Sequence, residues 1–449
     1  MASTSHSKKN KKLHKQKTSI SEAADKKGFI YYLQLVTFIA VAVLIFYPPF
    51  FQGLFFSEEM FATHIITGLI LLLIAIQKYY QKDLAILKTP LDWAVAAFAA
   101  AYLVSLAGAV HPGDAWYGFL RVLNYFAIYL AVSNVVKNFN HIETLSRILL
   151  ASGVGVAAIG ILAAFGLSDY PGAFMGGAVY STLQYSNATA VFLAVMALIA
   201  AGLWTREKRV VLKFIYLLAN SFMILVLLAT LSKGAWLIYA IGAIILISGM
   251  PKWYRVKVFY GLALPFAIGV AVFVKLYHII TSGHGSAIVY LLVGFFGVVV
   301  ALAIWELSVY VYKVKGAKLA ILSTVLIALL LLIPLGSLGN AVLQNQSISN
   351  EISGLLDFGS NSFTSRYDFN RWGWEIVKDY PVNGTGAGGW DALYPQYQDY
   401  LAWTTEVHNH FLQVWVETGI IGFIAWIAIL IIFVWMIVNY RKKSDHHNW

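Results

Sequence analysis

Twelve long apolar runs recur along the 449-residue chain, and each is near the length that a helix needs to cross a membrane. About 20 apolar residues span the ~30 Å hydrocarbon core of a bilayer as an α-helix. Composition agrees, because 59% of the residues are hydrophobic, only 12% are charged and the mean hydropathy is +0.71. The runs are residues 29–50, 60–77, 90–110, 117–136, 144–166, 188–204, 211–231, 235–250, 258–276, 286–312, 319–340 and 415–440. The sequence therefore predicts an all-α polytopic membrane protein with about twelve transmembrane helices.

The polar segments between these runs divide the chain into five parts. A basic tail (1–28) precedes a membrane domain of eleven helices (29–340), an external segment (341–414), the last transmembrane helix (415–440) and a short tail (441–449). The external segment is too long and too aromatic for a simple linker, so we expect function to be concentrated there.

The basic residues indicate how the chain is threaded, because loops rich in Lys and Arg stay in the cytoplasm. With the Lys-rich tail inside, the cytoplasmic segments hold 26 of the 32 basic and 8 of the 21 acidic residues. The inside then carries +18 and the outside −7, so the net charge of +11 reflects topology, and no nucleic-acid partner is needed. Both termini are expected in the cytoplasm, at a plasma or inner membrane. The chain has no cysteine, which excludes disulfides and thiolate metal sites.

Six basic residues break this trend by falling on or near the outer face: Arg121, Lys233, Lys275, Arg366, Arg371 and Lys378. A cation at the outer end of a span costs a few kcal/mol unless it snorkels to the interface or meets an anion. For Arg121 and Lys275 both explanations stay open. Lys233 lies in a turn of about four residues between two spans, beside Ser232 and Gly234, and this setting favours an anion site.

The stretch TSRYDFNRWGWEIVKDYP, residues 364–381, predicts a helix in the external segment. Thr364 or Ser365 can cap its start, apolar residues recur at spacings of three and four, and Pro381 ends it. Arg366 and Arg371 are five residues apart and therefore about 140° apart around the helix. They cannot both face one ligand, so one of the two is expected to be structural.

A glycine-rich run, NGTGAGGW at residues 383–390, follows this helix. It has no strand before it and no Lys-Ser/Thr pair after it, so it does not predict a nucleotide site. A flexible turn whose backbone N–H groups approach a phosphate fits better, with Gly386 and Gly388 as candidates. The next stretch, WDALYPQYQDYLAWTT, combines aromatic rings with amides and carboxylates. Such a surface suits sugars, and an interfacial aromatic belt is the equal alternative.

Titratable groups cluster in TTEVHNHFLQVWVETG, residues 404–419, just before the last apolar run. In a continuous helix over 408–417, Glu417 would lie nearly over His410 and about 180° from His408. His410 and Glu417 are therefore predicted to form a supporting pair. His408 would lie in the N-terminal turn, where the positive end of the helix dipole favours the neutral ring that a general base requires. A satisfied interfacial histidine is the alternative.

The order of these motifs resembles the C-terminal signature of the O-antigen ligase and polymerase family of membrane glycosyltransferases. The matching elements are Arg366 after a serine, Trp372 or Trp374, the loop YPVNGTGAGGW, and HNHFLQVWVETGIIGF with a glutamate nine residues after its first histidine. They cover residues 364–423. TLSKGAWL resembles a further family motif, S-R-G-A-W, with Lys233 in place of the arginine. The resemblance implies a GT-C-like glycosyltransferase fold with one large external loop between the last two spans.

This resemblance implies transfer of a glycan from a polyprenyl-pyrophosphate carrier to an acceptor hydroxyl on the outer face, with inversion and without a metal or other cofactor. His408 then activates or positions the acceptor, which is a glycan, a lipid or a protein, and Arg366 binds the pyrophosphate. Lysine at position 233 keeps the family arginine's charge but loses its bidentate fork. The candidate substrate-binding residues are Lys233, Arg371, Arg121, Gly386, Gly388 and Asn409.

Two other classes of protein stay open on the sequence. A transporter or flippase of lipid-linked saccharides would place ionisable groups near the midplane and show broken helices in two related halves. In this chain the polar groups gather at outer ends and in one asymmetric segment, and no internal repeat is visible. A non-catalytic glycan-binding or scaffold protein is the third possibility. Loss of activity in a stable His408→Ala variant would exclude both.

Overall fold

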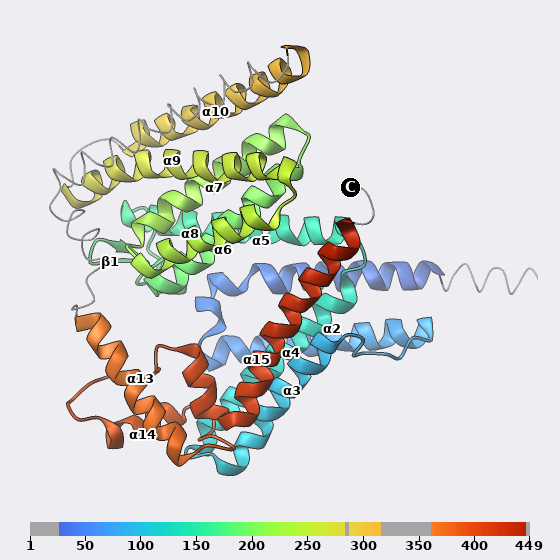
Figure 1. Cartoon of the computed structure of the whole chain (residues 1–449), viewed down its shortest axis with the longest axis vertical. Helices are drawn as coiled ribbons and strands as arrows, with labels where there is room; N and C mark the ends of the chain where they lie inside the picture. The colour runs from blue at the N-terminus through green and yellow to red at the C-terminus, as the bar shows by residue number, and fades with distance from the viewer. Residues whose placement is uncertain (1–26, 283–286, 316–360, 446–449) are drawn as a thin grey trace, which may run out of the picture. The chain divides into compact units, whose positions relative to one another are not determined.

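The computed structural model describes residues 27–282, 287–315 and 361–445, and most of them are helical (Figure 1). Ten helices in these ranges are long and apolar enough to cross a membrane, which confirms the all-α polytopic class. Each of the ten corresponds to one of the predicted runs. Of the remaining two, the run 235–250 forms a helix of 17 residues, and the run 319–340 lies outside the described residues.

The chain divides into two compact units. Unit 1 comprises residues 1–44, 57–137 and 358–449, and unit 2 comprises residues 45–56 and 138–357. The helices of unit 1 are α2 (Ser57–Gln81), α3 (Pro90–Ser105), α4 (Pro112–Val135), α13 (Asn361–Asp379), α14 (Gly389–Tyr397) and α15 (His410–Asp445). Those of unit 2 are α5 (Phe139–Ala164), α6 (Ser186–Arg206), α7 (Val210–Ala229), α8 (Lys233–Gly249), α9 (Lys252–Ser282) and α10 (Ala287–Lys315). A first span, Lys27–Phe50, precedes them.

In unit 1, α15 packs most extensively against α3, and α4 packs against both α2 and α3. Near one end of α15, α13 and α14 cover its first turns (Figure 1). Between them lies a buried apolar cluster, here named the external core: Phe369, Trp372, Ile376, Val377, Trp390, Leu393, Tyr394, Val407, Leu412 and Val416. The external core explains why this polar, loop-rich segment holds a fixed shape, because burying each large apolar side chain contributes roughly 1.5–3 kcal/mol.

In unit 2, small residues let the membrane helices approach closely. Ala194, Ala197 and Ala201 on α6 are fully buried where α6 packs against α7, as is common between membrane helices. Asn220 of α7 donates its side-chain N–H to the Gly261 carbonyl of α9 at 2.9 Å, so a polar group bridges two spans. The short elements of this unit are the antiparallel strands β1 (Phe174–Met175) and β2 (Ala178–Val179) and the 3-10 helices Pro48–Phe50, Gln52–Leu54 and Ser181–Leu183.

Candidate active site

The predicted helix of the external segment is present as α13, and it ends at Asp379, two residues before Pro381. The apolar residues spaced three and four apart, Phe369, Trp372 and Ile376, are all buried in the external core, as the predicted apolar face requires. The predicted start is wrong. The helix begins at Asn361, so Thr364 and Ser365 lie inside its first turns and do not cap it.

The two arginines of α13 have different surroundings, as their spacing predicts. The Arg371 guanidinium donates to the Asp399 carboxylate at 2.6 Å and lies 3.5 Å from Asp368. This hydrogen bond lowers the pKa of Asp399 and raises that of Arg371. Arg371 therefore ties α13 to the segment after α14, which is a structural role, whereas the exposed Arg366 lies toward His408.

His408 precedes α15 and does not lie in its N-terminal turn, which corrects the prediction. Its backbone is left-handed, with φ of 58°, and the helix begins two residues later at His410. The imidazole packs on the Phe369 ring at a centroid distance of 5.7 Å. Partial burial lowers the pKa of His408, and the charge of Arg366 lowers it further. Both effects favour the neutral ring, so the helix dipole is not needed to explain it.

His408 and Arg366, the two residues predicted to be catalytic, therefore lie near each other, Arg366 on α13 and His408 just before α15. Asn409 maintains this arrangement. Its side-chain oxygen accepts from the Leu412 N–H at 3.4 Å, near the start of α15, and its side-chain nitrogen donates to Asn370 on α13 at 2.6 Å. Asn370 in turn donates to the Arg366 carbonyl at 2.6 Å. Asn409 joins the two helices beside the candidate pair, so its contacts are structural.

The prediction that the backbone N–H groups of Gly386 and Gly388 are available to a phosphate is wrong. The Gly386 N–H donates to the Glu417 carbonyl at 2.9 Å, and the Gly388 N–H donates to the Glu417 carboxylate. All three glycines at 384, 386 and 388 have positive φ. At Gly384 a Cβ would lie within 2.5 Å of the backbone of α15. The glycines therefore allow a close approach of loop and helix, and the donors that a phosphate would need are already used.

Glu417 is the centre of this packing, and it does not pair with His410 as predicted. Its carboxylate accepts from the Tyr102 hydroxyl of α3 at 2.7 Å and from the Gln413 side chain at 2.8 Å. The His410 ring instead stands edge-on to Trp426 at 5.0 Å. Helix α15 is broken at Gly419, where φ is 59° and ψ is −161°. The helix is regular from His410 to Thr418, so His410 and Glu417 do share a face. A separation of seven residues puts them two turns, about 10.5 Å, apart, and Gln413 on the intervening turn reaches the carboxylate instead. Glu417 thus holds the glycine loop, α3 and α15 together.

A second carboxylate, Glu406, lies close to this cluster and was not singled out from the sequence. Loss of hydration and the nearby charge of Glu417 raise the pKa of Glu406 to about 7, although part of its side chain is exposed. Asp391 adds to this rise and Arg121 of α4 opposes it. Arg121 therefore lies among carboxylates, and its charge already has acidic neighbours within the protein. This favours a structural role over the predicted contact with substrate.

Lys233 lies in unit 2, as the first residue of α8. The turn before it is tight, as predicted: α7 ends at Ala229, and Leu231 has a left-handed backbone with φ of 55°. The Ser232 hydroxyl donates to the Asn187 side chain at 2.6 Å. Lys233 is partly buried in this turn.

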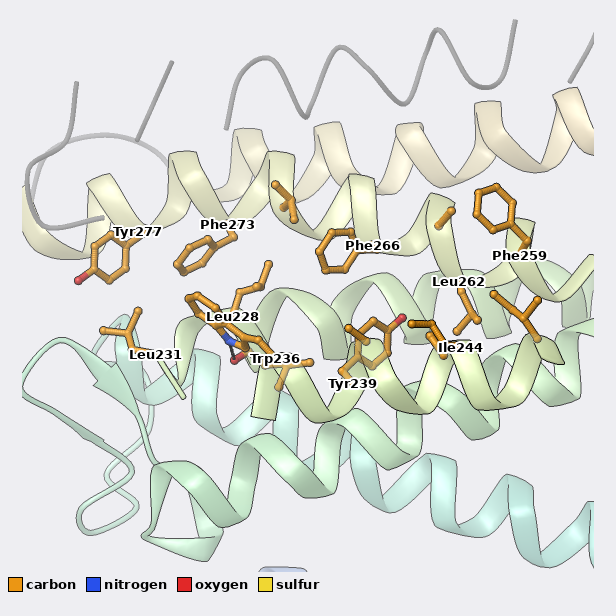
Figure 2. A pocket seen from close by; sticks show the side chains of 16 residues that line it. Leu228, Leu231, Trp236, Tyr239, Ile244, Phe259, Leu262, Phe266, Phe273 and Tyr277 are labelled. Carbon is orange, nitrogen blue, oxygen red and sulfur yellow. Dashed lines mark hydrogen bonds between the residues drawn. The ribbon is translucent and has the colours of Figure 1, made fainter. Parts of the chain in front are cut away.

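An apolar cavity of about 490 Å³ lies between α7, α8 and α9 in the same unit (Figure 2). In the sequence, Lys233 falls between two of its lining residues, Leu231 and Trp236. Tyr239 also lines the cavity, and its buried hydroxyl has no hydrogen-bond partner among the described residues. Its lining is Leu227, Leu228, Leu231, Trp236, Tyr239, Ala240, Ala243, Ile244, Ile247, Phe259, Leu262, Ala263, Phe266, Val270, Phe273 and Tyr277. Apolar patterning alone could not have found it, since every membrane helix carries such residues.

Comparison with protein families matches residues 270–427 to a family model described as O-antigen ligase. This segment includes α13, the glycine loop, His408 and Glu417. The chain carries an O-antigen ligase domain. The family resemblance of the C-terminal motifs is thereby confirmed. No curated protein and no solved structure matches the chain.

The O-antigen ligase domain covers roughly a third of the chain. Lys233 and Arg121 lie outside it, so their roles rest on motif resemblance and position alone. Together with the ten membrane-length helices, the domain makes this chain a multi-pass membrane protein of polysaccharide biosynthesis. Two residues that organise this region were not singled out from the sequence. Tyr102 lies in an ordinary apolar run and only the fold brings it to Glu417, whereas Glu406 stands two positions before His408 and its proximity offered a signal.

Proposed function

We propose that this protein is a GT-C-like membrane glycosyltransferase that moves a glycan from a polyprenyl-pyrophosphate carrier to an acceptor hydroxyl. The observation that carries the proposal is that Arg366 lies near enough to His408, inside the O-antigen ligase domain, for its charge to lower the pKa of the imidazole. Acceptors of three kinds fit this chemistry: a glycan, a lipid or a protein. We further propose that both termini lie in the cytoplasm and that the site faces the external or periplasmic side of a plasma or inner membrane.

The two residues have complementary tasks in such a transfer. The neutral imidazole takes the proton of the acceptor hydroxyl as its oxygen attacks the anomeric carbon. The bond from that carbon to the pyrophosphate oxygen breaks as the new glycosidic bond forms, so a single displacement inverts the configuration. Arg366 stabilises the negative charge that develops on the leaving pyrophosphate. Because His408 becomes an imidazolium beside this arginine, the pyrophosphate anion also offsets the repulsion between the two cations.

For unit 2 we propose a separate contribution to donor binding. The apolar cavity takes part of the hydrocarbon chain of the carrier, since a dry apolar cavity suits a hydrocarbon better than water. Lys233, which falls in the sequence between the lining residues Leu231 and Trp236, supplies a charge that attracts an anionic lipid head. A lysine supplies charge without a bidentate geometry, which suffices for attraction to a phosphate.

Glycan transfer measured in membranes tests this proposal. His408→Ala is expected to lower transfer by about 10²- to 10⁴-fold, the usual contribution of a general base. Arg366→Ala is expected to lower it by about 10²- to 10³-fold, through loss of leaving-group stabilisation. His410→Ala is the matched control, because His410 packs on Trp426 and should leave transfer near the wild-type rate. Normal transfer by the His408→Ala variant at normal abundance would refute the assignment and leave a transporter or scaffold.

A further inference from the structure

The segment between α14 and α15 exposes two large apolar side chains at its tip. Leu401 and Trp403 are each 91% exposed, more than any other large hydrophobic side chain in the described ranges. Tyr400 beside them is 45% exposed. Isolated apolar residues on a surface are common, but an adjacent trio with a fully open Trp is typical of a surface that binds something.

The backbone that presents this tip is held in place. The Ala402 N–H donates to the Gln398 side chain at 3.2 Å, and the Ala402 carbonyl accepts from the Tyr394 hydroxyl at 3.3 Å. Tyr394 itself is buried in the external core. Leu401 and Trp403 flank this anchored residue, so their exposure follows from the fold. A surface fixed in advance loses less entropy on binding.

A row of ring contacts connects the tip with the candidate base. Tyr400 packs on Trp372 at 5.3 Å, Trp372 packs on Phe369 at 5.7 Å, and Phe369 packs on His408 at 5.7 Å. Trp372 and Phe369 in the middle of the row are buried, so the row itself is not a surface. The Tyr400 hydroxyl, however, bonds to Asp368 on α13, two residues after Arg366, so the tip lies near the pair His408 and Arg366.

We propose that Tyr400, Leu401 and Trp403 bind a sugar ring of the glycan substrate. The inference rests on the proposed function and adds a binding surface to it. One face of a pyranose carries C–H groups that suit the electron-rich face of an indole, and its hydroxyls lie at the rim.

The charged groups beside the tip favour a sugar over a lipid chain. Asp399, bonded to Arg371, is exposed next to Tyr400, and the Tyr400 hydroxyl donates to Asp368 at 3.0 Å. Sugar hydroxyls can bond to the oxygen lone pairs of these carboxylates that still face water, whereas a hydrocarbon chain would cover charged groups and offer them no hydrogen bond.

Kinetics of three variants test the proposal. Trp403→Ala is expected to raise KM for the glycan about tenfold with kcat little changed, because the contact is made equally in ground and transition states. Trp403→Phe should restore most of the affinity, since it keeps an aromatic face. Trp93→Ala is the matched control: Trp93 lies in the first turn of α3 and is 64% exposed. KM measured separately for the lipid-linked donor and for the acceptor shows which of the two carries the bound ring.

A binding measurement separates this inference from the proposed function. The probe is the glycan that mild acid releases from lipid carriers of cells lacking this protein. Tryptophan emission of the purified wild type should change on its addition, and that of the Trp403→Phe variant should not. An unchanged KM for both substrates in Trp403→Ala, or quenching of Trp403 emission by brominated acyl chains, would overturn the inference. Glycan binding without any transfer by the wild type would instead refute the proposed function and leave the sugar surface standing.

Discussion

At the scale of single residues, the neighbours of His408 determine what it can do. Burial and Arg366 both lower its pKa below the usual 6.5, so the base is neutral over most of the pH range in which a cell surface operates. The sequence predicted a neutral His408, but for a different reason. It assumed a helix turn at that position, and the left-handed backbone of His408 excludes this. The left-handed conformation is rare for residues other than glycine, and a single sequence does not predict it.

The pH dependence of transfer should show this lowered pKa directly. Because the base must be unprotonated, kcat/KM is expected to fall on the acidic side only as the pH drops through a value below 6.5. Arg366→Gln removes a neighbouring cation, so the pKa of His408 rises and the acidic limb moves to higher pH. Arg366→Lys keeps the cation and should leave the limb in place. Residual activity measured from pH 4.5 to 8 checks this, and an identical limb in all three proteins would show that Arg366 does not act on His408.

Glu406 should make the stability of the protein depend on pH. Its pKa is raised from 4.5 to about 7 in the folded state, so the folded protein binds the proton more tightly than the unfolded chain does. The stabilisation is complete below pH 4.5 and is lost as the pH rises toward 7. Glu406→Gln cannot ionise, so its melting temperature should exceed that of the wild type at pH 8 and match it near pH 4.5. Equal melting temperatures at both pH values would contradict this account.

At the scale of elements, apolar runs predicted the membrane helices well because hydrocarbon thickness dictates their length. The glycine loop was misinterpreted for a physical reason. Glycine is required both where a backbone must approach a phosphate and where it must approach another backbone, and the sequence looks the same in the two cases. Only the contact between Gly384 and the turn before Gly419 decides between them. The break in α15 was equally hidden, since nothing in the sequence fixes the positive φ of Gly419.

Substitution at Gly384 should therefore damage the fold more than the chemistry. A Cβ there would lie 2.5 Å from three backbone atoms of residues 417–419, and the φ of 69° is unfavourable for other residues. Gly384→Ala is expected to lower the free energy of unfolding by about 2–4 kcal/mol. Gly202→Ala in α6 is the control, because nothing lies within 4 Å of its added methyl group. Thermal unfolding in detergent compares the two variants, and equal stabilities would argue against the tight packing.

At the scale of the whole molecule, a short signature identified the domain although most of the chain carries no distinctive motif. Composition and charge gave the membrane class, and residues 364–423 gave the family. The site itself was predicted in part. His408 and Arg366 do lie together, but Gly386, Gly388 and Asn409 have structural contacts that a motif cannot distinguish from substrate contacts. Sequence spacing also could not foresee that α3, far away in the chain, completes the packing around Glu417.

The contribution of unit 2 can be tested through its cation. If Lys233 attracts the anionic head of the donor, Lys233→Arg should retain or raise transfer, because the charge remains and a bidentate fork is added. Lys233→Ala should raise KM for the lipid-linked donor. Transfer rates over a range of donor concentrations decide the matter. Should Lys233→Arg be as inactive as Lys233→Ala, geometry and not charge would be the requirement.

The hydrogen bond between Tyr102 and Glu417 limits which segments of this protein can be exchanged with those of a relative in a chimera. The external segment resembles a transplantable cassette, being contiguous in sequence and provided with its own apolar core. Yet the Glu417 carboxylate, on the first turns of α15 that this segment packs against, accepts a hydrogen bond from a hydroxyl of α3, some three hundred residues earlier in the chain. A chimera that exchanges only the C-terminal segment would leave this carboxylate without its donor. The smallest unit that can be exchanged between relatives is therefore discontinuous, and it must include α3.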